Sequence, residues 1–137
     1  MIFVSESIND TYKIAEKVAR KCKGGEIILL NGELGAGKTT FTKGFAKALN
    51  VKNNVTSPTF TIMKSYYGDL TLRHFDMYRI NDEEELEELG FDDYFYGNDV
   101  CLVEWNKVKF IEKNVITVNI EYSGENKRTI TIEGVDL

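Results

Sequence analysis

The stretch EIILLNGELGAGKTTFTKGFAKAL, residues 26–49, decides the fold. It begins with a short, continuously apolar run, residues 26–32, which is typical of a strand buried on both faces of a parallel sheet. A glycine-rich turn follows, and apolar residues then recur at helical spacing from about Lys38 to Leu49. A strand, a glycine loop and a helix in this order form the first half of a βαβ unit, so the sequence predicts an α/β protein.

The turn itself satisfies the phosphate-loop pattern G-x-x-x-x-G-K-[ST] over residues 32–39. Glycines are needed there because a cradle of backbone N–H groups around phosphate oxygens requires dihedral angles and close approaches that a Cβ would block. The following helix adds the partial positive charge of its N-terminus. The pattern predicts a nucleotide site in which Lys38 binds the β and γ phosphates and Thr39 gives its hydroxyl to Mg²⁺.

Two acidic residues are candidates for the chemistry beside this loop. Glu104 ends the apolar run VCLVE, residues 100–104, where a phosphate-binding protein needs a carboxylate for its metal; an exposed strand-end glutamate is the alternative. Asp76 lies on the same strand face as His74 in HFDMYRI, and a charge among apolar neighbours needs a partner. The functional candidates for Asp76 are the Mg²⁺ shell and the attacking water, and the alternative is a salt bridge to Arg73 or Arg79.

Three further features have both a functional and a structural interpretation. His74, the one histidine of the chain, is more often a hydrogen-bonded core residue than a ligand. The hydroxyls of residues 57–59 could sense a γ-phosphate, as nucleotide switches do, or could cap the start of a strand. Trp105, the one tryptophan, could belong to the core or could cover the site.

The rest of the chain predicts alternating helices and strands in one domain, residues 1–137. Asp10 or Thr11 is expected to cap a helix that ends near residues 23–25, and Asn81 to start a second helix that ends at Gly90. Further strands are expected at residues 56–67, 69–80, 114–122 and 128–134, with turns at 67–69 and 123–126.

Composition limits the function classes. The chain has 137 residues, 17 basic against 22 acidic, and a formal net charge of −5, as expected of an ordinary globular protein rather than a disordered or coiled-coil one. No apolar run approaches the roughly 18 residues that span a bilayer, no signal-peptide pattern opens the chain, and Cys22 and Cys101 stand far apart, so we expect a cytoplasmic protein without membrane contact. Between Arg79 and Lys107 there are ten acidic residues and no basic one, which argues against DNA or direct RNA binding by this segment. Either a solvated helix face or a docking surface for a basic partner would explain these acids. They are Asp82, Glu83, Glu84, Glu85, Glu87, Glu88, Asp92, Asp93, Asp99 and Glu104.

Four motifs together resemble a known family. LGAGKTTFTKG, SPTFTI, HFDMYRI followed by EEELEELGFDDYF, and LVEW have the order and spacing of the bacterial TsaE (YjeE) family, over about residues 5–110. These are small ATPases needed for threonylcarbamoyladenosine (t⁶A) modification of tRNA. The resemblance implies a P-loop NTPase fold, a three-layer α/β sandwich with a mainly parallel central sheet and antiparallel edge strands. It also implies weak intrinsic ATP hydrolysis and association with the TsaB and TsaD proteins, which modify adenosine 37 of tRNAs that read codons beginning with A.

The same resemblance assigns residues to the site. Phosphates would lie on Gly35, Ala36, Gly37, Lys38, Thr39 and Thr40, Mg²⁺ on Thr39 and Glu104, and the adenine near Ile8 and Thr11, with Asp76 as an essential acid. The expected cofactors are therefore ATP and Mg²⁺, the catalytic residues Asp76, Glu104 and Lys38, and the partners TsaB and TsaD, with tRNA reached through them. The C-terminal strands match the family only as a pattern, so the resemblance assigns no role to Arg128.

Two other functions are compatible with a phosphate loop. A small-molecule kinase would need an acceptor pocket and usually arginines in a closing lid, whereas the segment after Arg79 is acidic and would repel a phosphorylated substrate. A nucleotide-sensing module without turnover would not need Glu104 and Asp76 together. No arginine can be assigned as a finger, so slow hydrolysis is the physical expectation.

Overall fold

The computed structural model describes residues 1–110 and 114–137. In these residues the helices are α1 (Ile8–Lys21), α2 (Lys38–Ala48) and α3 (Glu83–Glu88), with a short 3₁₀ helix, η1 (Asp92–Tyr96). The strands, in chain order, are β1 (Ile2–Ser5), β2 (Ile27–Asn31), β3 (Met63–Tyr67), β4 (Thr71–Asp76), β5 (Val100–Glu104), β6 (Val115–Gly124) and β7 (Lys127–Glu133).

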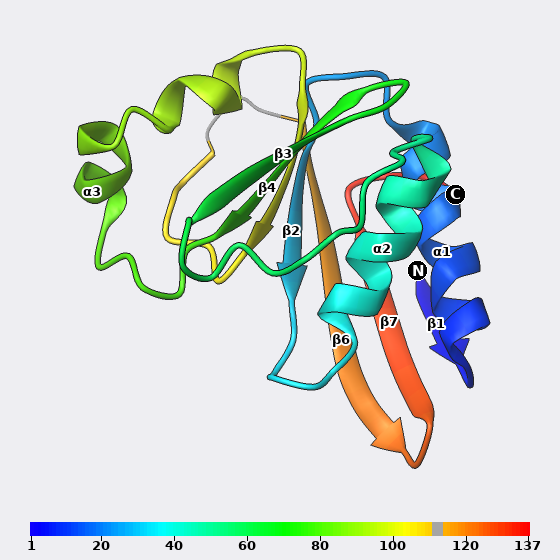
Figure 1. Cartoon of the computed structure of the whole chain (residues 1–137). Coiled ribbons are helices and arrows are strands. Elements are labelled where there is room, and N and C mark those ends of the chain that lie inside the picture. The colour runs from blue at the N-terminus through cyan, green and yellow to red at the C-terminus, as the bar shows by residue number, and fades with distance from the viewer. Residues whose placement is uncertain (111–113) are drawn as a thin grey trace.

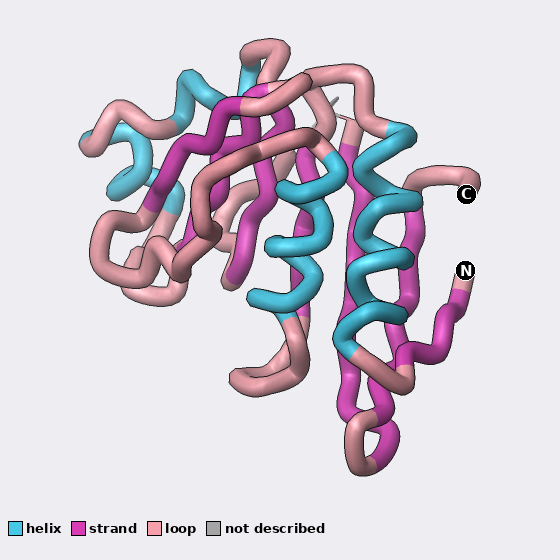
Figure 2. Tube along the Cα trace, turned by 45° about the vertical axis from the view of Figure 1, so that its right-hand side comes forward, coloured by secondary structure: helices cyan, strands magenta, loops and turns pink. Residues whose placement is uncertain are grey.

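The described strands form one seven-stranded sheet in the order β1-β7-β6-β2-β5-β4-β3. The four central strands β6, β2, β5 and β4 run parallel, whereas β1, β7 and β3 pair antiparallel at the two edges. Figure 1 shows this sheet twisting between α1 and α2 on one side and α3 on the other, and Figure 2 shows the same three layers from a second angle. The predicted fold class is confirmed.

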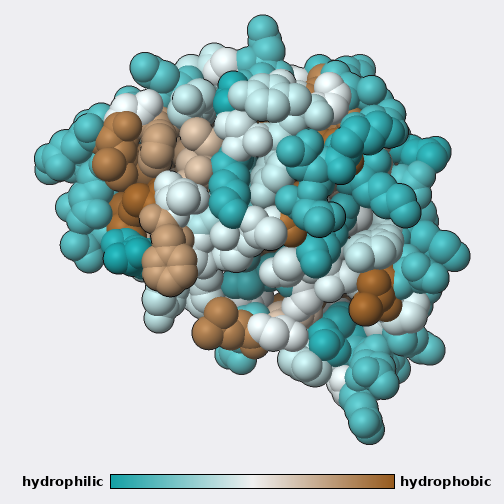
Figure 3. Space-filling model, viewed as in Figure 1, coloured by the Kyte–Doolittle hydropathy of each residue, from teal (hydrophilic) through white to brown (hydrophobic). Residues whose placement is uncertain are grey.

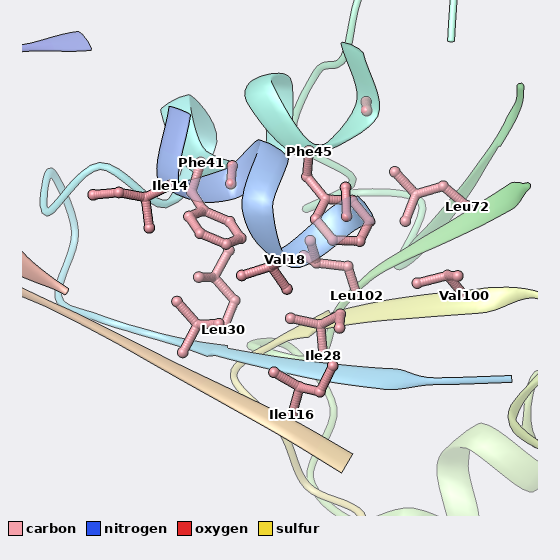
Figure 4. Packing of buried hydrophobic residues seen from close by; sticks show 14 of the residues in the cluster. Ile14, Val18, Ile28, Leu30, Phe41, Phe45, Leu72, Val100, Leu102 and Ile116 are labelled. Carbon is pink, nitrogen blue, oxygen red and sulfur yellow. The ribbon is translucent and has the colours of Figure 1, made fainter. Parts of the chain in front are cut away.

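Each face of the sheet has its own core. Phe41 and Phe45 of α2 pack with residues of α1 over the strand residues Ile28, Leu30 and Leu102 (Figure 4). On the other face, Leu86 of α3 and Phe95 of η1 pack with apolar residues of β4 and β5. Because it is covered on both faces, β5 is buried along its whole length, as the continuous apolar run at residues 100–103 predicts.

The first helix begins earlier than the sequence analysis expected. Ser7 is the N-cap of α1, and its hydroxyl accepts a hydrogen bond from the backbone N–H of Asp10 at 3.0 Å. Asp10 and Thr11 therefore lie inside the first turn, and the prediction that one of them caps the helix is wrong. Ser competes well with Asp at the N-cap, so composition alone does not distinguish these positions. The edge strand β1 was not predicted either.

The strand predicted at residues 56–67 is half loop. Residues 56–62 lie outside any strand and contain a turn at 59–61, and β3 begins only at Met63. Ile62 has a φ of 69°, which a β-branched residue rarely adopts, and this residue ends the turn that follows Pro58. Other boundaries also shift: residues 77–80 lie outside β4, and Asp82 rather than Asn81 caps α3. β6 extends to Gly124, into the turn predicted at 123–126, and β7 begins directly after that turn, at Lys127.

The turn between β3 and β4 is docked on the end of α2. The backbone N–H of Asp69 donates to the carbonyl oxygen of Leu49 at 2.6 Å, and the Asn50 side-chain amide donates to the Asp69 carboxylate at 2.6 Å. A Cβ at Gly68 would lie 2.1 Å from that Leu49 oxygen, so only glycine allows this approach. The helix that follows the glycine loop is thereby joined to the hairpin that carries Asp76.

Both cysteines are buried thiols, and burial raises the pKa of the Cys22 thiol to about 12. Cys22 therefore stays protonated at neutral pH, as a packing residue rather than a metal ligand. The surface in Figure 3 is mostly hydrophilic, with apolar side chains gathered toward the side of α3. Within residues 1–110 and 114–137, no helix has both the length and the apolar character needed to cross a membrane.

Candidate functional site

The glycine loop connects the end of β2 to the first residue of α2. Gly35 and Gly37 adopt φ angles of 81° and 110°, which glycine reaches without strain. Gly37 is the N-cap of α2 and supplies no side chain to cap it, so the N–H groups of the first turn are left for another acceptor. A loop of this form at a helix N-terminus is suited to bind an anion.

Lys38, the first residue of α2, points to the end of β5. Its Nζ lies 3.7 Å from Oε1 of Glu104 and 4.1 Å from the centroid of the Trp105 ring. The side chains of Lys38 and Glu104 are only 7% and 9% exposed, so their attraction is screened less than that of a surface pair. The interpretation of Glu104 as an exposed strand-end residue is therefore wrong.

Asp76 ends the neighbouring strand β4 and stands beside Glu104 in the parallel register of β4 and β5. Its Oδ1 accepts the backbone N–H of Tyr78 at 3.0 Å, and its Oδ2 accepts the Thr59 hydroxyl at 3.1 Å. In the described part of the chain it forms no ion pair with either arginine considered for it. Arg73 instead donates to Asp99 at 2.9 Å; desolvation alone would lower the pKa of its guanidinium, but the bond and charge of Asp99 outweigh it and raise that pKa.

The hydroxyls of residues 57–59 lie in the same place. The hydroxyls of Ser57 and Thr59 are 2.6 Å apart, and Thr59 reaches Asp76 as described. Because β3 begins four residues after Thr59, the interpretation of this segment as a capped strand start is wrong. The loop connects the surface to a carboxylate at the end of a central strand.

Trp105 covers the site. Its φ of 56° lies in the left-handed region, which a tryptophan adopts only where its surroundings hold it. Tyr78 contacts its ring edge-on at a centroid distance of 5.1 Å, and Lys38 lies over the ring as given above. Trp105 is half-buried and belongs to neither hydrophobic cluster of the described residues, which favours the interpretation that it covers the site.

Two hollows flank the glycine loop, and we name them by their positions. The strand-end pocket, about 310 Å³, lies where β4 and β5 end and is lined by Leu34, Gly35, Gly37, Lys38, Thr39, Thr40, Ser57, Thr59, Asp76, Glu104 and Trp105. The N-terminal pocket, about 320 Å³, is lined by Ser5, Glu6, Ser7, Ile8, Thr11, Gly37, Thr40, Asn126 and Arg128. Gly37 and Thr40 line both, so the two hollows meet at the start of α2.

These two pockets account for every predicted site residue except one. Gly35, Gly37, Lys38, Thr39, Thr40, Asp76 and Glu104 line the strand-end pocket, and Ile8 and Thr11 line the N-terminal pocket together with Gly37 and Thr40. Ala36 is buried and lines a third cavity, about 540 Å³, between the loop and β6. The fold thus brings together the residues that were predicted from the sequence, and their chemical roles stay predictions.

Arg128 is the site residue that the sequence analysis left without a role. Its Nε donates to the carbonyl oxygen of Ala36 at 2.9 Å, and its guanidinium carbon lies 3.7 Å from the centroid of the Tyr122 ring. It comes from β7, 92 residues after Ala36, and the antiparallel pairing of β6 with β7 brings it there. No local pattern around Arg128 could have revealed this contact.

Thr39 and Glu104 offer the strand-end pocket one hydroxyl and one carboxylate for a metal ion. Within the described residues, no group of three or more His, Cys, Asp or Glu side chains could hold a metal by itself. Mg²⁺ in phosphate-binding proteins is held by one or two protein oxygens, with phosphates and water completing its shell. The donor set therefore fits Mg²⁺ that arrives with a nucleotide rather than a permanently bound metal.

A glycine loop between a central parallel strand and a helix, with carboxylates at the ends of the adjacent strands, defines the class of P-loop α/β proteins. A family model described as "Threonylcarbamoyl adenosine biosynthesis protein TsaE" matches residues 5–130. The chain belongs to the TsaE family.

Curated relatives named "tRNA threonylcarbamoyladenosine biosynthesis protein TsaE" agree with this. The protein from Bacillus subtilis is 47% identical over 131 residues, covering 92% of this chain and 80% of its own length. That from Aquifex aeolicus is 45% identical over 132 residues, covering 94% and 92%. The crystal structure of Bacillus subtilis YdiB superimposes with a TM-score of 0.76 at 38% identity, covering 96% of this chain and 83% of that one.

Proposed function

We propose that this protein is a Mg²⁺-dependent ATPase that acts in the threonylcarbamoyl modification of tRNA. The family and the names of the relatives support its participation in that pathway. In this proposal the strand-end pocket takes the phosphates and the N-terminal pocket takes the base. The protein acts in the cytoplasm through TsaB and TsaD, which modify adenosine 37 of tRNAs reading codons that begin with A.

One observation carries the catalytic part of the proposal. The register of β4 and β5 aligns Asp76 with Glu104, and Lys38 lies within 3.7 Å of Glu104. Two carboxylates and an ammonium are thus gathered, nearly buried, at a loop whose N–H groups suit phosphate. A module that only stores nucleotide has no need of a second carboxylate at this position.

Each residue has a definite task in this proposal. The N–H groups of residues 35–40 and the Lys38 ammonium bind the phosphates and offset their charge. Thr39 and Glu104 would hold Mg²⁺, which supplies positive charge to the developing negative charge on the phosphate oxygens when it is bound. Asp76, held by the Thr59 hydroxyl and the backbone of Tyr78, orients the attacking water and accepts its proton.

The N-terminal pocket offers a hydrogen-bond acceptor to a bound base. Ser5 donates its hydroxyl proton to the carbonyl oxygen of Ser7 at 2.9 Å, so the 2.7 Å contact between the Ser5 and Thr11 hydroxyls uses the Thr11 proton. The Thr11 oxygen is then left to accept. Such an acceptor is compatible with the amino group of adenine, and the preference for adenine over guanine rests on the family resemblance.

Hydrolysis by the protein alone should be slow. Among the described residues that line the strand-end pocket there is no arginine, and Arg128 lines the N-terminal pocket instead. A missing arginine finger is worth on the order of 10³ to 10⁵ in rate. We therefore expect TsaB and TsaD to supply or complete the missing charge.

The test is MgATP hydrolysis by the purified protein, alone and with TsaB and TsaD from the same source. Glu104→Ala serves as the inactive reference, and Glu133→Ala, which removes an exposed acid at the end of β7, as the matched control. Little turnover alone and a clear rise with the partners would support the proposal. Equal rates with and without the partners, in a protein that binds ATP, would favour a self-sufficient kinase or a passive sensor.

A further inference from the structure

We infer that His74 is a positioning residue, which fixes the Glu104 carboxylate by donating a hydrogen bond from Nε2. The hydrogen bond is a property of the protein alone. Its consequence for turnover rests on the proposed ATPase function. Nothing in the phosphate-loop pattern calls for a histidine on the strand beside the loop.

The contact is short and protected from water. His74 Nε2 lies 2.6 Å from Oε2 of Glu104, and the two side chains are 3% and 9% exposed. His74 stands opposite Leu102 in the register of β4 and β5, so Glu104 lies two residues farther along the facing strand, on the same side of the sheet. Both side chains are therefore placed by central strands and not by a loop.

The geometry also indicates which ring nitrogen carries the proton. Nδ1 of His74 is buried and has no hydrogen-bond partner within the described residues. A tautomer protonated only on Nδ1 would bury an unpaired N–H and turn the Nε2 lone pair toward a carboxylate oxygen, which repels it. With the proton on Nε2, the buried hydrogen bond is made, and only a lone pair is left without a partner.

This bond divides the two oxygens of Glu104. Oε2 is taken by His74, while Oε1 remains directed to Lys38 at 3.7 Å, beyond hydrogen-bond distance. Without His74, the carboxylate is free to rotate into a direct ion pair with Lys38, which would take both charges away from the phosphates. His74 thus keeps Glu104 near Lys38 but prevents a direct ion pair between them. Loss of a residue that orients a metal-binding side chain typically lowers activity or metal affinity 10- to 100-fold.

The first experiment needs no nucleotide. Since His74 is the one histidine in the sequence, ¹⁵N-histidine labelling gives a single set of ring signals by NMR. We expect protonated Nε2, with a proton that exchanges slowly with water, and a marked shift of that proton in Glu104→Gln. A ring protonated only on Nδ1, or ring signals unchanged by Glu104→Gln, would overturn the inference.

The second experiment compares two replacements of His74. Gln can place an amide N–H near the position of Nε2, whereas Phe fills the ring volume without a donor. We expect His74→Phe to lower kcat at least tenfold and to leave ATP affinity within about threefold of wild type. The fluorescence of Trp105, the single tryptophan, measures that affinity. We expect His74→Gln to recover most of the lost kcat. A folded His74→Phe protein with wild-type kcat would contradict the inference, as would a folded His74→Gln protein no better than His74→Phe.

The two experiments separate the inference from the proposed function. A wild-type protein that binds ATP without turnover, alone and with partners, overturns the ATPase proposal, while the NMR result still decides the hydrogen bond. Thermal unfolding of each variant shows whether it folds. If His74→Phe fails to fold, the comparison of His74→Gln with wild type and the NMR signals decide the question.

Discussion

The strand-end pocket and the N-terminal pocket lie on either side of the same glycine loop and are built differently. In the first, Lys38, Asp76 and Glu104 are buried, and each is held by a neighbour. In the second, Ile8 is 63% exposed, and polar contacts are made by hydroxyls and by one arginine of β7. Charged groups are costly to bury, so their arrangement is fixed by the fold, whereas none of the described charged residues that line the second pocket is buried.

The difference implies a division of labour. Groups held rigidly in a nearly dry pocket stabilise developing charge without reorganising, which is what a chemical step requires. A pocket that offers hydroxyls and an exposed apolar residue contributes mainly to affinity. Substitutions in the strand-end pocket should therefore abolish binding or turnover, and those in the N-terminal pocket should change affinity by small factors.

The largest effect should come from Lys38→Ala. Removing the ammonium leaves the phosphates and Glu104 without their shared positive charge, and we expect MgATP affinity to fall more than about 100-fold. Isothermal titration calorimetry measures this, with Lys43→Ala, an exposed lysine of the same helix, as the control. Unchanged affinity in Lys38→Ala would remove the phosphate-loop interpretation altogether.

Asp76→Asn should separate turnover from binding. The amide keeps the shape of the side chain but is a poor base, so we expect kcat to fall about 100-fold or more while the affinity for ATP stays within a few-fold. The readout is phosphate release with partners present, and Asp136→Asn, an exposed acid after β7, is the control. Full tRNA modification by Asp76→Asn in cells would demote Asp76 to a structural residue.

Arg128→Gln tests the connection between β7 and the loop. It removes the guanidinium bonded to the Ala36 carbonyl oxygen, and we expect ATP affinity to weaken about 3- to 10-fold, the value of roughly one hydrogen bond, with kcat nearly unchanged. The comparison of ATP affinity and kcat checks both parts. A kcat loss as large as that of Asp76→Asn would make Arg128 a catalytic residue and end the contrast between the two pockets.

The smallest effect should come from Ile8→Ala. Ile8 is 63% exposed and can contact only one side of a bound base, so much of its surface stays in water in the complex, and we expect less than about a threefold loss of ATP affinity. Competition between ATP and inorganic triphosphate measures the affinity for both ligands. Because triphosphate has no base, Ile8→Ala should weaken the binding of ATP only. An equal change for both ligands would show that Ile8 does not contact the base.

The strand-end pocket could be predicted from the sequence because its residues carry local signals. Glycines, an apolar run that ends in Glu104 and a charged residue within an alternating strand all restrict the backbone or the burial of their own segment. The parallel sheet then brings the ends of its strands to one edge, so the positions of Asp76 and Glu104 follow from the element order.

What could not be predicted depends on pairing between distant segments. Arg128 reaches the loop through the pairing of β6 with β7, and β1 is a short, exposed edge strand with little pattern of its own. The segment before Met63 alternates like a strand, but Pro58 and the positive φ of Ile62 turn it into a loop that brings Thr59 to Asp76. Tertiary contacts decided these cases against local propensity.

The docked turn at Gly68 has a consequence for anyone who maps this protein by saturation mutagenesis. Gly68 is exposed, far along the hairpin from Asp76, and belongs to neither pocket. Every side chain at this position nevertheless meets the Leu49 carbonyl oxygen, so a growth screen would score it as intolerant as a catalytic residue. Measuring the amount of folded protein beside fitness would distinguish the two, since variants at Gly68 should be scarce, whereas those at Asp76 should be abundant and inactive.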